Sequence, residues 1–298
     1  MLRYEADIRS LVFMVIAAGS LVFLWQYGSE LSTPLWILCY MIQLLMAVII
    51  STIVHNHQHL PIWTAKLPNI LTDNFLTVFY GFPVFAWIPT HNTNHHVHIN
   101  REPDYTKTYM VSEKNNLLTL LTYPSISGYK QQGAVGSYFL GLYRTDRRKF
   151  FFHLLQIVSL VVWIAVALLI DWKKAVLYVI IPQQLSLFTV LIFNYIQHIH
   201  ADEESEFNHS RNMTGKTLNF FLLNNGLHTA HHISPGVHWS KLREKHDKIA
   251  PNIDPRLNES NFAWYLFRVY ILGLFSPSFR TQNMRMERMQ NVALTTSN

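Results

Sequence analysis

The residues in this sequence with the clearest chemical potential are its histidines. The chain has sixteen histidines among 298 residues, roughly twice the number in an ordinary chain of this length. Most stand in four short clusters, which read VHNHQH from residue 54, HNTNHHVH from 91, QHIH from 197 and LHTAHH from 227. Neutral imidazole is the commonest protein ligand for metal ions. Metal binding is therefore the first chemistry that these clusters indicate.

The spacing within the clusters supports that interpretation. Residues three or four positions apart share one face of a helix, so they can present their side chains to the same point. This spacing recurs at His55 and His59, at His91 and His95 with His96 adjacent, at Asn194 and His198, and at His228, His231 and His232. Four helix ends could therefore converge with imidazoles pointing inward.

The number of clustered imidazoles predicts more than one metal ion. Unpartnered imidazoles are costly to desolvate, and they repel one another when protonated. Nine nitrogens exceed the needs of one ion, so we expect two metals. A hydrolytic zinc site uses about three protein ligands, and nine candidates far exceed that number. This excess favours redox chemistry, although imidazole also suits zinc, copper and nickel. The candidate ligands are His55, His59, His91, His95, His96, His198, His228, His231 and His232.

The remaining histidines and the nearby acids receive other roles. His57 should point away from His55 and His59, while His98 and His200 could support the ligands. His153 should lie at the membrane interface, and the other histidines should be structural or exposed. A metal-bound imidazole needs its second N–H fixed by a carboxylate or carbonyl. The acids near the clusters are equally compatible with exposed charge; they are Asp104, Asp202, Glu203 and Glu204.

The elements that position these residues are predicted to be membrane helices. Hydrophobic residues make up 50% of the chain and charged residues 14%, against about 25% charged in soluble domains. Apolar stretches of about 20 residues can nearly cross a hydrocarbon core of about 30 Å. They occupy about 11–27, 35–54, 150–170 and 175–193. Short turns join them into two hairpins.

The sequence thus predicts an all-α integral membrane protein that forms a single domain over residues 1–298. It has four transmembrane helices in two hairpins, together with a His-rich helical cap. Two shorter apolar runs, 75–88 and 262–275, should be interfacial or re-entrant helices. The polar segment 281–298 is expected to be a flexible tail.

Basic residues predict the orientation. All but two of the 24 lysines and arginines lie in the first ten residues, in 55–149 or after 193. By the positive-inside rule, both termini and all histidine clusters should be cytoplasmic. The net charge of +6 fits this bias and anionic headgroups, and it does not call for nucleic acid. The basic stretch Arg144–Lys149 should anchor the third span at the headgroups, or else dock an acidic electron donor.

The histidine clusters resemble the three histidine boxes of the membrane-bound fatty acid desaturase superfamily. The boxes here are H-x-x-x-H at 55–59, H-x-x-x-H-H at 91–96 and H-x-x-H-H at 228–232. The resemblance implies a non-haem di-iron centre that uses O2 to desaturate a fatty acyl chain, as an acyl-lipid or acyl-thioester, in the membrane. It also carries the motif N-x-x-x-H onto Asn194 and His198, as a water-positioning Asn and a further ligand.

The same superfamily leaves alternatives open. It includes alkane, fatty acid and carotenoid hydroxylases and ketolases, and terminal-alkene-forming decarboxylases, which the boxes do not separate. A His-rich metal transporter is a remote alternative, because such a protein needs ionisable residues along an ion path and the four spans hold no acids. Asn194 is expected to orient water or oxygen beside the metals, or otherwise to cap a helix or bond a neighbouring backbone group.

Electrons are expected to come from a separate protein. The single cysteine, Cys39, cannot hold an iron–sulfur or rubredoxin centre, and the sequence has no H-P-G-G haem motif. It also has His228 where front-end desaturases usually carry Gln. The expected donor is of ferredoxin, rubredoxin or cytochrome b5 type, with its reductase.

Overall fold

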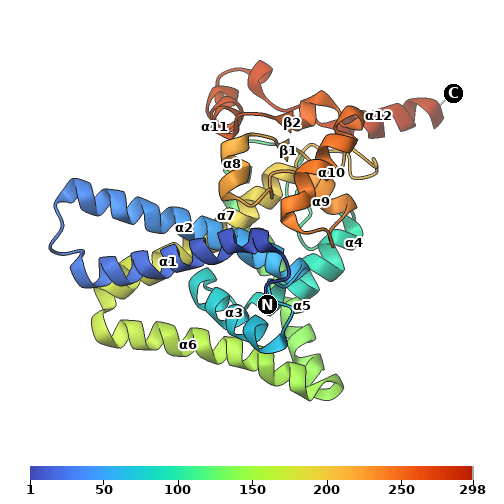
Figure 1. Ribbon diagram of the computed structural model, residues 1–298. Coiled ribbons are helices and arrows are strands. Elements are labelled where there is room, and N and C mark those ends of the chain that lie inside the picture. The colour runs from blue at the N-terminus through green and yellow to red at the C-terminus, as the bar shows by residue number, and fades with distance from the viewer. Residues whose placement is uncertain (297–298) are drawn as a thin grey trace. The chain divides into compact units, whose positions relative to one another are not determined.

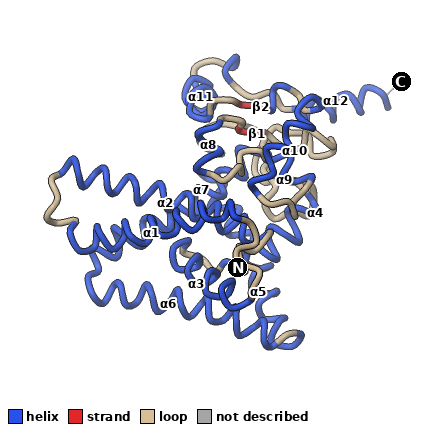
Figure 2. The backbone as a smooth tube through the Cα atoms, in the orientation of Figure 1, coloured by secondary structure: helices blue, strands red, loops and turns tan. Residues whose placement is uncertain are grey.

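The computed structural model describes residues 1–296, and within them helices and connecting loops make up the chain apart from two strands of two residues each (Figure 1, Figure 2). This confirms the all-α class. The chain divides into two compact units. The first contains Met1–Pro89 and Gly133–Val190, and the second contains Thr90–Gln132 and the residues from Leu191 onwards.

The first unit contains the long apolar helices. Its elements are α1 (Ile8–Tyr27), α2 (Thr33–His59), α3 (Lys66–Tyr80), α6 (Arg147–Ala175) and a π-helical turn at Val176–Ile180, with the later part of α5 (Leu117–Thr145) and the earlier part of α7 (Ile181–His198). Two stretches, Glu5–Tyr27 and Thr33–His59, each have the length and composition to cross a membrane. A third, Arg147–His198, is 52 residues long. A straight helix of that length would measure roughly 78 Å, far more than one crossing needs.

The long third stretch is broken at Asp171. This residue has extended backbone angles, φ −158° and ψ 100°, and its Oδ1 accepts the N–H groups of Lys173 and Lys174. That is the pattern of a residue that caps the start of a new helix. The ring of Trp163 lies 6.4 Å from that of Phe79, while Gln183 donates to the carbonyl of Val78.

These contacts show that the chain reverses direction at the break. Twenty residues of continuous helix would place positions 163 and 183 roughly 30 Å apart, yet both lie beside the end of α3. The predicted turn at 171–174 thus joins two antiparallel apolar segments. Whether each segment crosses the membrane stays a prediction.

Polar side chains inside the first unit hold its helices together. Gln43 Nε2 donates to the carbonyl of Tyr178 at 2.7 Å, and Ser186 Oγ donates to that of Ala47 at 2.8 Å. Gly81 ends α3 with φ +85°, and a Cβ there would lie 2.5 Å from Gln183 Cβ. Buried polar groups with backbone partners stabilise packing, so these hydrogen bonds hold the helices of the first unit together.

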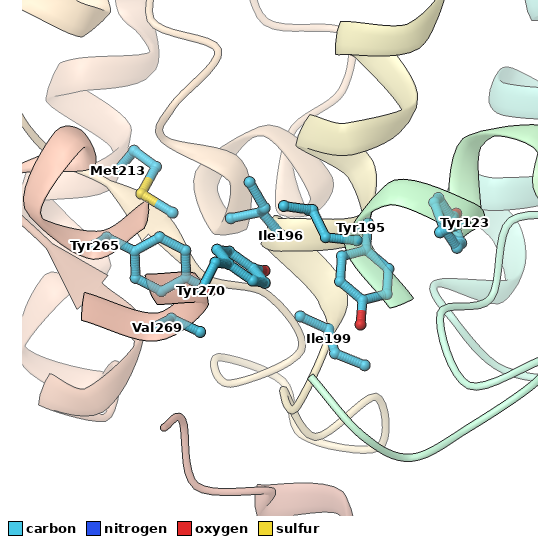
Figure 3. Packing of buried hydrophobic residues seen from close by; sticks show 9 residues of the cluster. Tyr123, Tyr195, Ile196, Ile199, Met213, Tyr265, Val269 and Tyr270 are labelled. Carbon is cyan, nitrogen blue, oxygen red and sulfur yellow. The ribbon is translucent and has the colours of Figure 1, made fainter. Parts of the chain in front are cut away.

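The second unit is built from short helices around a tyrosine-rich core. Its helices are α4 (His96–His98), α8 (Lys216–Phe221), α9 (His228–Ile233), α10 (Leu242–Ile249), α11 (Phe262–Leu266) and α12 (Met284–Thr296), preceded by a π-helix at Ile88–His95. Strands β1 (Asn212–Met213) and β2 (Asn258–Glu259) pair in parallel. Figure 3 shows Tyr195 and Ile196 of α7 packed with Met213, Tyr265 and Tyr270. This core fixes the last turns of α7, which end at His198.

Most of the segment that the sequence predicts to be a flexible tail forms a helix. Residues 284–296 form helix α12, and positions 297–298 lie outside the described residues. Arg285 pairs with Glu113 and Glu203, and Arg288 pairs with Asp202 at 2.6 Å. The polar composition of the segment does not reveal these long-range ion pairs, which connect the helix to other residues of the second unit.

Candidate metal centre

Seven of the nine predicted ligands lie in the second unit, where they form two sets. One set contains His95, His198, His228 and His232. All four are buried, and one ring nitrogen from each lies within 4.8 Å of the others. His228 Nε2 is 2.9 Å from His198 Nε2 and 3.0 Å from His232 Nε2. Two nitrogens bound at right angles to a metal at about 2.1 Å are about 3.0 Å apart. The spacing therefore fits ligands of one ion.

The other set contains His91, His96 and His231. His96 Nε2 lies 3.1 Å from His91 Nε2 and 2.9 Å from His231 Nε2. The two remaining candidates, His55 and His59, end helix α2 in the first unit, with ring centres 4.8 Å apart. That these two complete the set of His91, His96 and His231 stays a prediction from the sequence.

The second and third histidine boxes are each divided between the two sets. His91 shares its set with His96, five residues on, and not with His95, although the rings of His91 and His95 stack with their centres 5.2 Å apart. The reason is the π-helix over Ile88–His95, whose wider turn brings residues five apart onto one face. On α9, His228 and His232 share a face at the expected spacing, while His231 joins the other set.

Hydrogen bonds fix the orientation of the His95 ring. Its Nδ1 lies 2.7 Å from Asp104 Oδ2, and the carboxylate also accepts the N–H groups of Asn100 and Thr106. His95 Nε2 is buried and has no hydrogen-bond partner among the described residues. A buried polar atom without a partner is costly, and a metal ion would supply one. The arrangement is the carboxylate–histidine pair that orients metal ligands.

His198 is oriented by a backbone carbonyl. Its Nδ1 donates to the carbonyl oxygen of His209 at 3.1 Å, which leaves Nε2 facing His228. From the sequence, His209 is expected to be structural or exposed, because it stands outside the clusters and no spacing connects it with His198. Its ring is buried and lies 5.5 Å from that of His232.

The surroundings keep these groups in the charge states that metal ligation needs. Burial lowers the pKa of His232 well below its usual value, and the nearby His96 and His228 rings lower it further. Burial alone would raise the pKa of Asp104, but His95 and the hydrogen bonds from Thr106 bring it below its ordinary value. At neutral pH the site thus has a neutral imidazole at His232 and a carboxylate at Asp104, which are the forms suited to binding a metal.

Asn194 belongs to the network behind His95. Its Nδ2 donates to the carbonyl of Thr106 at 3.2 Å and to the hydroxyl of Tyr123 at 2.7 Å. The Tyr123 hydroxyl donates to the same carbonyl, so the amide must present Nδ2 to both. Thr106 in turn donates its Oγ1 to Asp104. The sequence identified Asn194 and Asp104 but gave no sign of Thr106 and Tyr123, which connect them.

Other candidate residues have structural partners. His57 accepts the N–H of Ile62 and lies 3.3 Å from Asp73, so it points away from the ligands as predicted. His200 contacts Thr281 and the carbonyl of Glu113. Asp202 and Glu203 pair with the arginines of α12, and Glu204 pairs with Arg101. These three acids support arginines and not the imidazoles of the ligands.

Residues 31–264 match a protein family that is described as fatty acid desaturase. The matched region is most of the chain and includes all nine candidate ligands. The chain belongs to the fatty acid desaturase family. The histidine clusters fit the histidine boxes of that family, as the sequence predicted. No curated protein and no solved structure matched the chain.

Membership of the desaturase family accounts for both the histidine sets and the apolar helices. The family consists of oxidoreductases that act on lipids, and the long apolar helices of the first unit identify a membrane protein. The two sets of converging nitrogens fit the metal centre that such a desaturase-like scaffold holds.

The pairing of His95 with Asp104 predicts a specific metal-binding defect. Asp104→Asn should lower metal affinity by about 10–100-fold, because the neutral amide holds the imidazole less firmly. Asp73→Asn is the matched control, since Asp73 contacts His57, which is not a candidate ligand. Metal retention after dialysis against graded chelator measures both. Equal retention in Asp104→Asn and the wild type would show that the carboxylate does not support the site.

Proposed function

We propose that the protein is an O2-dependent di-iron desaturase that acts on a fatty acyl chain, as an acyl-lipid or acyl-thioester, in the membrane. The observation that carries this proposal is the pair of histidine sets in a chain of the fatty acid desaturase family. His95, His198, His228 and His232 would hold one iron. His91, His96 and His231 would hold the other, together with His55 and His59.

Iron and O2 are part of the proposal because the reaction needs a strong oxidant. Bound iron, with O2 and two electrons, would supply the oxidising power that removes hydrogens from an unactivated carbon chain. The protein's own residues do the rest. Asp104 and the His209 carbonyl orient imidazoles, burial excludes water, and Asn194 keeps its Oδ1 for water or oxygen because its Nδ2 is already engaged.

The same proposal places the protein in the membrane with four spans. The break at Asp171 divides the long third stretch into two segments, and the distribution of lysines and arginines favours cytoplasmic termini and a cytoplasmic metal centre. Electrons would come from a separate ferredoxin, rubredoxin or cytochrome b5 type donor with its reductase, because Cys39 alone cannot hold a redox cluster.

Product analysis tests the reaction. Expression in a host of known lipid profile should yield acyl chains that each carry one additional double bond, as measured by mass spectrometry of lipids and hydrocarbons. The matched control is His95→Ala, which should give the profile of the host alone. Hydroxylated chains, modified carotenoids or terminal alkenes in place of unsaturated chains would assign the chain to one of those reactions on the same scaffold and contradict desaturation.

Reporter fusions test the proposed topology. Fusions after Glu30 and after Trp172 should report the side opposite to fusions after Arg148 and at the C-terminus, because each hairpin returns the chain to the cytoplasm. If the Glu30 and Arg148 fusions report the same side, the model of two membrane-spanning hairpins is wrong.

Substitutions at Asn194 and His198 should separate the two roles proposed for them. Asn194→Ala should retain most of its iron but lose most turnover or release hydrogen peroxide, because it removes the Oδ1 proposed to orient water or oxygen. His198→Ala should lose iron. Iron content, peroxide and product are measured on the same preparations. If Asn194→Ala lowers stability by about 1–2 kcal/mol while turnover per iron stays at the wild-type level, Asn194 only holds the Thr106 backbone.

A further inference from the structure

A cavity of about 290 Å³ lies within the first unit, beside the beginnings of α3 and α6. None of the nine candidate metal ligands lines it. Its walls include Lys66 at the start of α3 and Arg148, Lys149 and His153 in the first turns of α6. The cavity therefore combines basic groups with a buried imidazole, at the point where α6 begins its apolar stretch.

Three cations gather at this cavity, and each lies near an aromatic ring. Lys66 Nζ lies 5.4 Å and Arg148 Cζ 5.7 Å from the centre of the same ring, Phe152. Lys149 Nζ lies 5.8 Å from the ring of Tyr138. Among the described residues, none of the three basic groups forms an ion pair. An aromatic ring attracts a cation but does not cancel its charge, so the group is suited to an anion.

The two carboxylates in the lining are already engaged. Asp73 Oδ1 accepts from Gln58 Nε2 at 2.9 Å and lies 3.3 Å from His57 Nε2. Asp146 Oδ1 accepts the N–H of Lys149 and caps the start of α6. Three cations and two carboxylates leave one positive charge in excess. This excess matches the single negative charge of a phosphodiester.

His153 supplies an independent sign of a missing ligand. The side chain is 7% exposed and lines the cavity, and its Nδ1 has no hydrogen-bond partner among the described residues. The ring is held in place by stacking on Phe85, with ring centres 4.6 Å apart. A buried polar atom without a partner is costly. A phosphate oxygen in the cavity would accept a hydrogen bond from this nitrogen.

We propose that this cavity binds the phosphate of a phosphodiester, supplied by the headgroup of a membrane phospholipid. The proposal rests on the proposed membrane placement of α6, whose first turns would lie at the depth of the lipid phosphates. Lys66 and Arg148 would pair with the phosphate oxygens, and His153 would bond from the buried side. The basic start of α6 thus has a defined ligand, beyond a general attraction to the membrane surface.

Binding to the full-length protein in non-ionic detergent tests this site. The probe is a short-chain phosphatidylglycerol, and the matched probe without phosphate is the corresponding diacylglycerol. The double variant Lys66→Gln, Arg148→Gln should weaken phosphatidylglycerol binding at least about tenfold, because it removes both charge-assisted contacts. Arg144→Gln, Arg147→Gln is the matched control: it removes the same charge from neighbouring residues that do not line the cavity, so its affinity should stay within about twofold of wild type.

A second variant addresses the buried side of the cavity. His153→Phe keeps a ring against Phe85 but removes the unpartnered nitrogen, and it should also weaken binding. Iron content equal to wild type in every variant would show that folding is intact, and it separates this test from the test of desaturation. Competition by inorganic phosphate at similar affinity would identify a soluble phosphate compound as the ligand source. Equal loss of binding in both double variants, or equal binding of diacylglycerol, would overturn the proposal.

Discussion

The second unit gathers seven imidazoles, of which five are buried and two, His91 and His96, are half-buried. Desolvating an unpartnered ring costs free energy, and protonating it would place a positive charge among its neighbours. The low pKa of His232 shows how strongly the surroundings disfavour the charged ring. Metal cations bound to these nitrogens would relieve this cost, which fits a metal centre in a chain of the fatty acid desaturase family.

The same constraint accounts for irregular backbone around the site. A π-helix places His91 with His96, and left-handed residues follow it at Ile99 (φ 45°) and Asn100 (φ 65°). A β-branched residue rarely adopts that conformation, and strain of this kind concentrates at functional sites. The turn brings Asp104 back beneath His95, where the carboxylate fixes the ring. The hydrogen bond between Asp104 and His95 thus offsets part of the conformational cost of the left-handed residues.

The sequence predicted the features that depend on residue type and local spacing. The apolar stretches became long helices, and the histidines of the last box share α9. It could not predict what depends on tertiary contacts. Regular spacing grouped His91 with His95, whereas His91 shares a set with His96 and His95 belongs to the other set. The Asn194–Thr106–Asp104 network joins distant segments through a backbone carbonyl, which no side-chain pattern encodes. Helix α12 likewise owes its place to ion pairs with Glu113, Asp202 and Glu203.

The central claim is that the two histidine sets hold two irons in one chain. The most direct measurement is the metal content of the purified, enzymatically active protein made with adequate iron, determined by elemental analysis against protein concentration from amino-acid analysis. The account predicts close to two irons per chain, with turnover rising in proportion to iron content up to that value. A preparation that is fully active with one metal per chain, or with a metal other than iron, would contradict it.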